Sequence, residues 1–147
     1  MQIVFGADHA GYLLKESLVR AATAGGYSVA DLGTDSPDPV DYPDFAAAVA
    51  REVAGGRAER GVLVCGSGAG ASIAANKVRG VRCAVAHDTY TAHQMVEHDD
   101  VNVLAVGSRV VGPALAEEIM FAFLTARFTN EERHRRRLNK VIALEEE

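Results

Sequence analysis

The chain has 147 residues, of which 48% are hydrophobic and 24% charged, an ordinary composition for a soluble globular protein. The length predicts a single domain covering residues 1–147. The net charge of −5 argues against a general nucleic-acid binder. No apolar stretch is long enough to span a bilayer, and the first residues read as a strand rather than a signal peptide. We therefore expect a cytoplasmic protein without nucleic-acid or membrane partners, in which Cys65 and Cys83 stay reduced.

Short apolar runs alternate along the chain with longer amphipathic segments. The apolar runs predict five strands, at residues 2–6, 27–32, 61–65, 82–86 and 103–106. The amphipathic segments predict five helices, at residues 11–24, 42–54, 69–77, 89–97 and 112–127. This alternation predicts a Rossmann-like, three-layer α/β fold, with an open parallel sheet of five strands and helices on both faces. A sixth helix, over about residues 130–144, carries five basic residues, and we expect it to reach a partner subunit.

Polar residues follow several of the predicted strands. In open parallel sheets, ligands bind beyond the carboxyl ends of the strands. Asp8 and His9 follow the first strand, a glycine-rich loop that begins at Cys65 follows the third, and Arg109 comes soon after the fifth. The helix after the fourth strand ends at residues 98–100, which are His, Asp and Asp. We expect these polar groups to converge on one active site.

The loop Cys65-Gly66-Ser67-Gly68-Ala69-Gly70 leaves a buried strand and opens a helix. Glycines let backbone N–H groups approach an anion closely, and the helix N-terminus adds a favourable dipole. Such surroundings favour a cysteine thiolate. The loop does not follow the first strand, as a dinucleotide fingerprint would, and no Walker lysine follows Gly70. A cysteine phosphatase would need an arginine where Ala71 stands. A general base beside an oxyanion-binding loop fits these residues, and a buried cysteine at a tight turn is the alternative.

Six motifs in this order resemble those of the ribose-5-phosphate isomerase type B family, which also includes galactose-6-phosphate and allose-6-phosphate isomerases. The resemblance covers nearly the whole chain. The motifs are Asp8-His9-Ala10-Gly11, Asp41-Tyr42-Pro43, Cys65-Gly66-Ser67-Gly68, Ile73-Ala74-Ala75-Asn76-Lys77, Asn102-Val103-Leu104 and Gly107-Ser108-Arg109.

The resemblance implies an aldose–ketose isomerase that interconverts ribose 5-phosphate and ribulose 5-phosphate through an enediolate. Cys65 would move the proton between C1 and C2, and His98 would assist opening of the furanose ring. No metal or cofactor is implied. The chain would form a homodimer, or a dimer of dimers, with shared active sites. The implied substrate-binding residues are Asp8, His9, Gly66, Ser67, Gly68, Ala69, Gly70, Ala71, Asp99, Arg109, Arg133 and Arg137, with Tyr42 and His134 as further possible contacts.

Three positions bear on the substrate. Arg133 and Arg137 are four residues apart, so they share one helix face and could grip one phosphate, with a solvated basic tail as the alternative. Asp99 stands where the family usually has asparagine, and an ionised carboxylate would repel the substrate oxygen that becomes negative. The alternative substrates are therefore allose 6-phosphate, galactose 6-phosphate or another pentose phosphate. A nucleotide-binding module like the universal stress proteins is a more distant alternative, although the glycine motif of those proteins is absent.

Three other residues, Cys83, His93 and His87, could act in the site or could have structural roles only. Cys83 lies in a predicted strand and is expected to belong to the core. His93 is expected to be an ordinary helix residue. His87 stands at a strand end, where a structural role and contact with substrate are equally open.

Overall fold

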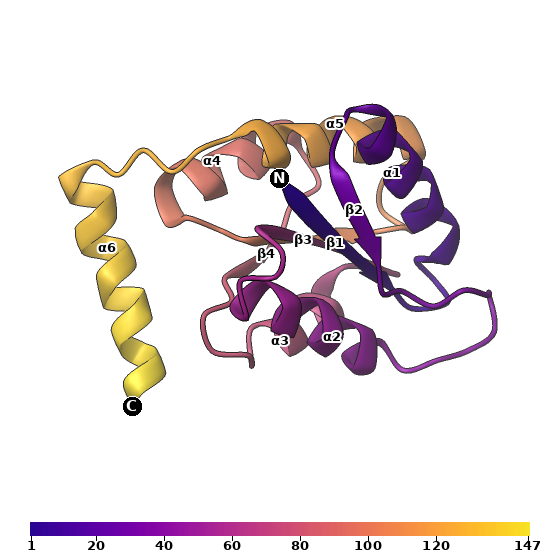
Figure 1. Ribbon diagram of the computed structural model, residues 1–147, viewed down its shortest axis with the longest axis horizontal. Helices are drawn as coiled ribbons and strands as arrows, with labels where there is room; N and C mark the ends of the chain where they lie inside the picture. Colours follow the sequence, from indigo (N-terminus) through magenta and orange to yellow (C-terminus); the bar gives the residue numbers. More distant parts are fainter.

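A computed structural model describes residues 1–147 as a five-stranded parallel sheet between two layers of helices (Figure 1). The strands are β1 (Gln2–Ala7), β2 (Ser28–Asp31), β3 (Arg60–Cys65), β4 (Cys83–Val85) and β5 (Val103–Gly107), in the spatial order β2-β1-β3-β5-β4. The helices are α1 (Tyr12–Ala24), α2 (Tyr42–Ala54), α3 (Ala69–Ala75), α4 (Thr89–Asp99), α5 (Pro113–Thr125) and α6 (Glu132–Ala143), followed by a short 3-10 turn, Leu144–Glu146. The predicted α/β fold is confirmed, with element boundaries within a few residues.

The sheet separates two apolar cores. A cluster of 22 buried residues fills the space between one face and helices α1, α4 and α5. A cluster of 14 buried residues lies on the other face, against α2 and α3. All six residues of β3 and all five of β5 are buried, as expected for central parallel strands covered on both faces. None of the helices has the length and apolar character needed to cross a bilayer.

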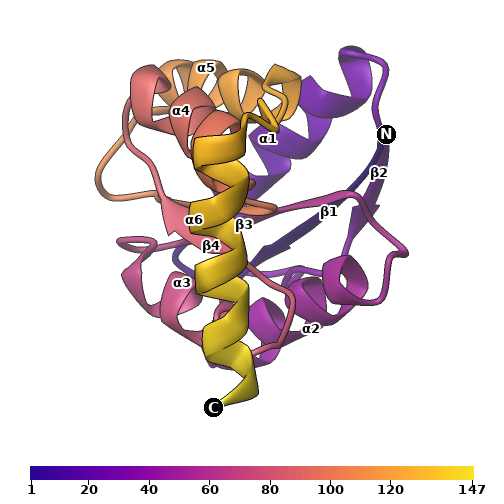
Figure 2. The ribbon, with the colours of Figure 1, turned by 90° about the vertical axis from the view of Figure 1, so that its left-hand side faces the viewer.

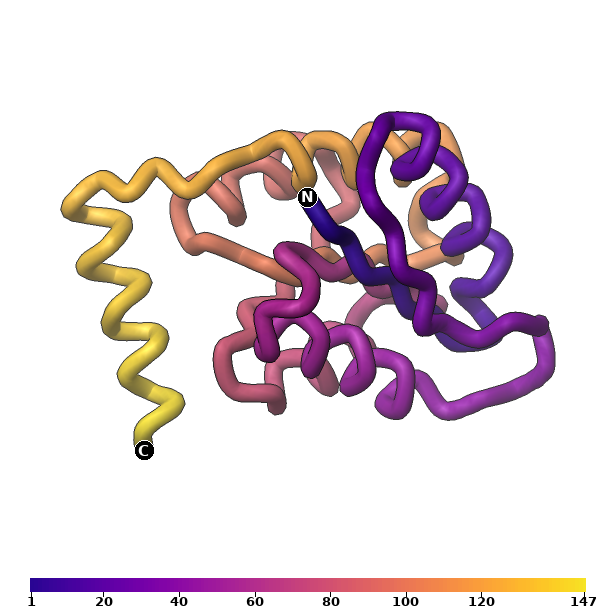
Figure 3. The backbone as a smooth tube through the Cα atoms, in the orientation of Figure 1, coloured from indigo at the N-terminus to yellow at the C-terminus, as the bar shows by residue number.

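The chain reverses direction across the sheet after β2. It passes from β1 to β2 on one side and then returns to β3 on the other side of β1. Helices α1 and α2 therefore leave on opposite faces, and a crevice opens beyond the carboxyl ends of β1 and β3. The loop of residues 32–41, which joins β2 to α2, follows a wide arc away from the sheet (Figure 3). The fold thus places Asp8 and Cys65, which end neighbouring strands, at the mouth of one crevice.

Helix α6 lies beside the amino ends of the strands, at the end of the sheet opposite the crevice (Figure 2). Its first turn lies by the end of α4, and the N–H of Thr129 in the preceding linker donates to the Glu97 carbonyl at 3.0 Å. The far end of the helix reaches the α3–β4 loop, where the Gly80 N–H donates to Glu145 at 3.0 Å. Only two residues of α6, His134 and Leu138, are buried. The helix therefore leaves most of its surface uncovered.

Candidate active site

A cavity of about 330 Å³ opens at the carboxyl ends of β1 and β3. This is the place where open α/β sheets bind their ligands. Seven of the eight residues that line it are site residues predicted from the sequence, and Val110 is the exception. The lining residues are Asp8, Tyr42, Cys65, Gly66, Ser67, Gly70, Arg109 and Val110.

Cys65 is the last residue of β3, and its thiol is held by the loop that follows. Its side chain is buried, and the Gly68 N–H donates to its Sγ at 3.1 Å. Gly68 has a φ of +83°, which glycine adopts without strain. A Cβ atom at Gly68 would also lie 3.2 Å from the backbone of Val106, a tight contact that a larger residue could make only if the backbone shifted. The Gly68 amide therefore fixes the position of the sulfur at the end of β3.

The amides after Gly68 open helix α3 beside this sulfur. Intrahelical hydrogen bonds of α3 begin at the Ser72 N–H, which donates to the Gly68 carbonyl at 3.0 Å. The N–H groups of Gly70 and Ala71 belong to the first turn, which an α-helix leaves without backbone partners. The Ala69 N–H donates to the Ser67 hydroxyl at 3.2 Å. Donors therefore cluster next to Cys65, as the oxyanion-binding interpretation requires.

Asp8 and His9 are fixed by backbone groups at the end of β1. The Asp8 Oδ1 atom accepts the Gly11 N–H at 3.1 Å, and the side chain is buried. The His9 Nδ1 atom accepts the Val40 N–H at 3.1 Å, so the neutral ring carries its proton on Nε2. His9 thereby anchors the end of the β2–α2 loop and keeps one ring nitrogen free. Of these two predicted contacts, Asp8 lines the cavity and His9 does not.

Tyr42 and Arg109 form walls of the cavity. The Tyr42 ring packs on Gly70 so closely that a Cβ atom there would lie 2.7 Å from the ring. The Arg109 guanidinium lies over Gly66, 3.3 Å from the position of a Cβ atom. Arg109 is exposed and takes part in none of the ion pairs of the chain. Its positive charge is therefore available to an anionic substrate.

The predicted site residues fall into two groups that lie at opposite ends of the strands within one chain. In a β–α–β unit the helix runs back against its strands, so the end of α4 lies where the strands begin. There the Asn102 carbonyl accepts the Gly61 N–H at 2.9 Å, next to the start of β3. Gly61 and Cys65 are four residue steps apart on an extended strand, a distance of roughly 13 Å. His98, Asp99, Arg133, Arg137 and His134 therefore lie at the edge opposite the cavity, on α4 and α6.

His98 and His134 form a stacked pair between α4 and α6. Their ring centroids lie 4.1 Å apart, with 24° between the ring planes. His134 is 3% exposed, and its Nδ1 atom lies 2.5 Å from the Thr129 hydroxyl. Burial, with further contributions from His98 and the Arg133 cation, lowers the pKa of His134, so the pair favours a neutral ring.

Arg133 and Arg137 are exposed on α6, one turn apart. Arg133 Nε pairs with Glu131 at 3.0 Å, and Arg137 takes part in none of the ion pairs of the chain. Arg133 and Arg137 can therefore lie on the same face of α6, as predicted. Within one chain, however, no part of this face approaches Cys65.

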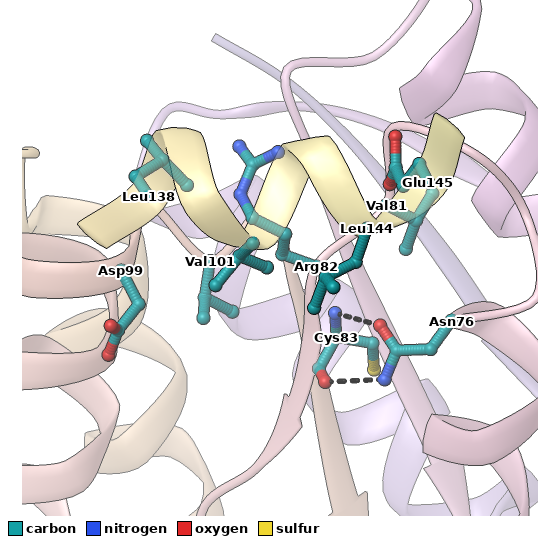
Figure 4. A pocket seen from close by; sticks show the side chains of 10 residues that line it. Asn76, Val81, Arg82, Cys83, Asp99, Val101, Leu138, Leu144 and Glu145 are labelled. Atoms are coloured by element: carbon teal, nitrogen blue, oxygen red, sulfur yellow. Dashed lines mark hydrogen bonds between the residues drawn. The ribbon is translucent and has the colours of Figure 1, made fainter. Parts of the chain in front are cut away.

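A second cavity, of about 400 Å³, lies between α6 and strand β4 (Figure 4). Its walls include Cys83, Leu138 and Asp99, and six of its ten lining residues are apolar. Burial raises the pKa of Cys83 to about 12, so this thiol stays protonated and is a poor base. The prediction that Cys83 belongs to the core is confirmed.

Two further residues complete the description of the site. The His87 Nε2 atom accepts the Gly107 N–H at 2.8 Å, which gives His87 a structural role at the end of β5. Val110 lines the cavity, and a lone valine after Arg109 carries no chemical signal that could identify it from sequence. No group of three or more His, Cys, Asp or Glu side chains is arranged to hold a metal ion.

Comparisons with known proteins agree with this geometry. The model of a protein family described as Ribose/Galactose Isomerase matches residues 3–141. Ribose-5-phosphate isomerase B of Escherichia coli (strain K12) is 45% identical over 145 residues, which cover 99% of this chain and 97% of that protein. Ribose-5-phosphate isomerase B of Clostridium thermocellum has a similar structure, with a TM-score of 0.97, 45% identity and coverage of 99% of this chain and 98% of that one.

A third similar protein was solved with a ligand. The structure of ribose-5-phosphate isomerase B from Mycoplasma genitalium with bound ribulose-5-phosphate has a TM-score of 0.94 and 38% identity, and the match covers 99% of this chain and 97% of that one. Similarity over the full length removes the alternative of a module like the universal stress proteins.

Proposed function

The chain belongs to the Ribose/Galactose Isomerase family, and we propose that it interconverts ribose 5-phosphate and ribulose 5-phosphate. The observation that carries this proposal is the Cys65 thiol, which lies in the cavity at 3.1 Å from the Gly68 N–H. The proposed cellular location is the cytoplasm, where the two free cysteines, Cys65 and Cys83, stay reduced.

The proposed reaction moves one proton between two carbons. The Cys65 thiolate takes the proton from C2 of the open-chain aldose, and the electron pair of the C–H bond forms an enediolate with its charge on O1. The proton of the C2 hydroxyl then passes to O1, and the thiol returns its proton to C1, which leaves the ketose. The amides of Gly70 and Ala71 and the Ser67 hydroxyl supply donors for the transient oxyanion.

Ring opening must come before this step, because ribose 5-phosphate is mainly a furanose. Opening breaks the C1–O4 bond, so that O1 loses its proton and O4 gains one. We assign assistance of this step to His98, which lies at the other edge of the sheet. A single chain cannot bring His98 to Cys65 across roughly 13 Å of strand. The site therefore needs a second copy of the chain.

We propose that two copies form a homodimer, alone or within a dimer of dimers, with two shared active sites. Each cavity would hold Cys65, Asp8 and Arg109 of one chain. The partner subunit would supply His98 and Asp99 from the end of α4 and the phosphate-binding arginines from α6. The support is geometric, because these residues are exposed or half-buried and none can reach its own cavity. In such an arrangement, Arg109, Arg133 and Arg137 would together neutralise the phosphate.

The substrate can be tested directly with the purified protein. Turnover of ribose 5-phosphate, allose 6-phosphate and galactose 6-phosphate should be measured side by side, and ribose 5-phosphate should give the highest kcat/KM. A higher value for either hexose phosphate would move the proposal to that sugar within the same chemistry. No turnover of any phosphorylated aldose would refute the isomerase function itself.

Asp99→Asn should raise kcat/KM for ribose 5-phosphate by about tenfold. Removing a carboxylate close to the developing oxyanion relieves a repulsion of roughly 1 kcal/mol or more. The same variant should be assayed with both hexose phosphates, with Asp100→Asn as a neighbouring control. A lower kcat/KM for all three sugars would show instead that Asp99 contributes a useful contact, such as one with a sugar hydroxyl.

His98→Asn should lower turnover of cyclic sugars by roughly 100-fold, in the range for loss of one acid–base group. D-erythrose 4-phosphate is a suitable comparison, because its O4 carries the phosphate and cannot close a furanose ring. If wild-type protein accepts this tetrose, its turnover should change little in the variant. Equal losses with both sugars would contradict a role in ring opening.

A further inference from the structure

The His98 ring is held along one edge by its own helix. Gln94 lies one turn earlier on α4, and its Nε2 atom is 2.8 Å from His98 Nδ1. An amide nitrogen has hydrogens to donate and no lone pair to offer, so Nδ1 must be the acceptor. The neutral His98 ring therefore carries its proton on the other nitrogen, Nε2.

The face of the same ring is held by α6. The His134 ring stacks on His98 with centroids 4.1 Å apart, and it is itself fixed by the Thr129 hydroxyl. The backbone N–H of Thr129 donates to the Glu97 carbonyl, which ties this arrangement back to α4. A flip of the His98 ring by half a turn would break its contact with Gln94, and a tilt of the ring out of its plane would break its stacking on His134. The stack on His134 fixes the plane of the ring, and the contact with Gln94 fixes which edge of the ring carries Nδ1.

The Nε2 edge of His98 is the part of the ring that stays available. No donor or acceptor of the chain is bonded to Nε2, and this atom is not among the buried polar atoms that lack a partner. An N–H that is held in a fixed direction and left free of partners is suited to donate to a bound molecule.

Resting on the function proposed above, we propose that Gln94 is a positioning residue for ring opening. It holds His98 in the Nε2–H tautomer, so that this N–H donates to the furanose ring oxygen in the partner subunit's cavity. Negative charge develops on O4 as the C1–O4 bond breaks, and a donor placed there stabilises it. The opposite tautomer would present a lone pair to the same oxygen and repel it.

The tautomer can be read by nuclear magnetic resonance, independently of activity. Long-range ¹H–¹⁵N correlation spectra of protein with ¹⁵N-labelled histidine distinguish the two forms. Wild-type His98 should show the Nε2–H form. Gln94→Leu should show a mixture, and Gln94→Glu should move the proton to Nδ1, because a carboxylate accepts and cannot donate. His93→Gln, on the same helix, serves as a control that should leave the His98 signals as in wild type.

Kinetics provide the second measurement. Gln94→Leu and Gln94→Glu should each lower kcat for ribose 5-phosphate by about tenfold, less than complete loss of a donor because His98 itself remains. Turnover of D-erythrose 4-phosphate should stay at the wild-type level. A general loss of stability would lower both rates, so the ratio of the two rates separates positioning from folding.

The possible outcomes are distinct. A wild-type Nδ1–H tautomer, or an unchanged tautomer in Gln94→Leu, would overturn the proposal. So would equal losses with the cyclic and the acyclic sugar. Wild-type protein that turns over neither sugar would refute the proposed function, whereas the spectra would still report whether Gln94 sets the tautomer.

Discussion

Cys65→Ala should lower the rate of ribose 5-phosphate isomerisation by roughly 1,000-fold, within the range for loss of a positioned general base. This factor corresponds to about 4 kcal/mol of transition-state stabilisation. Binding of the sugar phosphate should persist, because the substitution removes one sulfur atom and no positive charge. The rate should be followed by formation of ribulose 5-phosphate, and the dissociation constant by isothermal titration calorimetry.

Cys83→Ala is a matched control for that experiment. It removes the other thiol of the chain, which is also buried and has a pKa raised to about 12 by burial. This variant should lose some stability and retain the turnover of the wild type. If Cys65→Ala also kept its turnover, the base would have to be another residue, and Asp99 would be the first to test.

Mixing two inactive variants should restore about a quarter of the wild-type activity if two subunits share each site. One variant carries Cys65→Ala, and the other carries Arg133→Ala together with Arg137→Ala. Random reassortment makes half of the dimers mixed, and one of the two sites in each mixed dimer is then intact. Each parent alone should lose at least about 100-fold in kcat/KM, because the double variant removes two charge-assisted contacts to phosphate. Subunits should be exchanged in mild denaturant and assayed after its removal.

A second mixture tests the same geometry from the other direction. Cys65→Ala mixed with Asp8→Asn should recover nothing, because both residues line the cavity of one chain. Native mass spectrometry should verify that mixed dimers have formed in both experiments. Verified mixed dimers without recovered activity in the first mixture would show that Cys65 and the α6 arginines do not meet at one site.

The part of the site around Cys65 is predictable from local sequence. A fully apolar strand followed by glycines predicts a buried strand and a tight turn, and the loop begins where such a strand ends. Asp8 and Arg109 follow strands in the same way. Because ligands bind at the carboxyl ends of parallel strands, these positions in the chain are enough to predict that the three residues share one cavity.

The part around His98 depends on relations that local sequence does not contain. His98 lies near the end of helix α4. A helix that connects two parallel strands runs back along the sheet, so it ends at the amino ends of the strands. The position of β4 at the outside of the sheet also depends on β5, which comes later in the chain and pairs between the consecutive strands β3 and β4. The stack of His98 on His134 depends in turn on the path of the linker before α6. For these reasons the sequence predicts that His98 and Cys65 serve one active site, but not that they lie apart within a single chain.

Asn76 has a consequence for how copies of this chain can associate. Its side-chain amide donates to the Cys83 carbonyl at 2.8 Å and accepts the Cys83 N–H at 2.7 Å (Figure 4). These are two of the backbone groups that edge strand β4 would otherwise offer to another strand. One side chain thus occupies the place of a neighbouring strand and protects the edge from β-sheet polymerisation. Assembly is thereby directed away from fibre-like stacking and toward contacts made by helices.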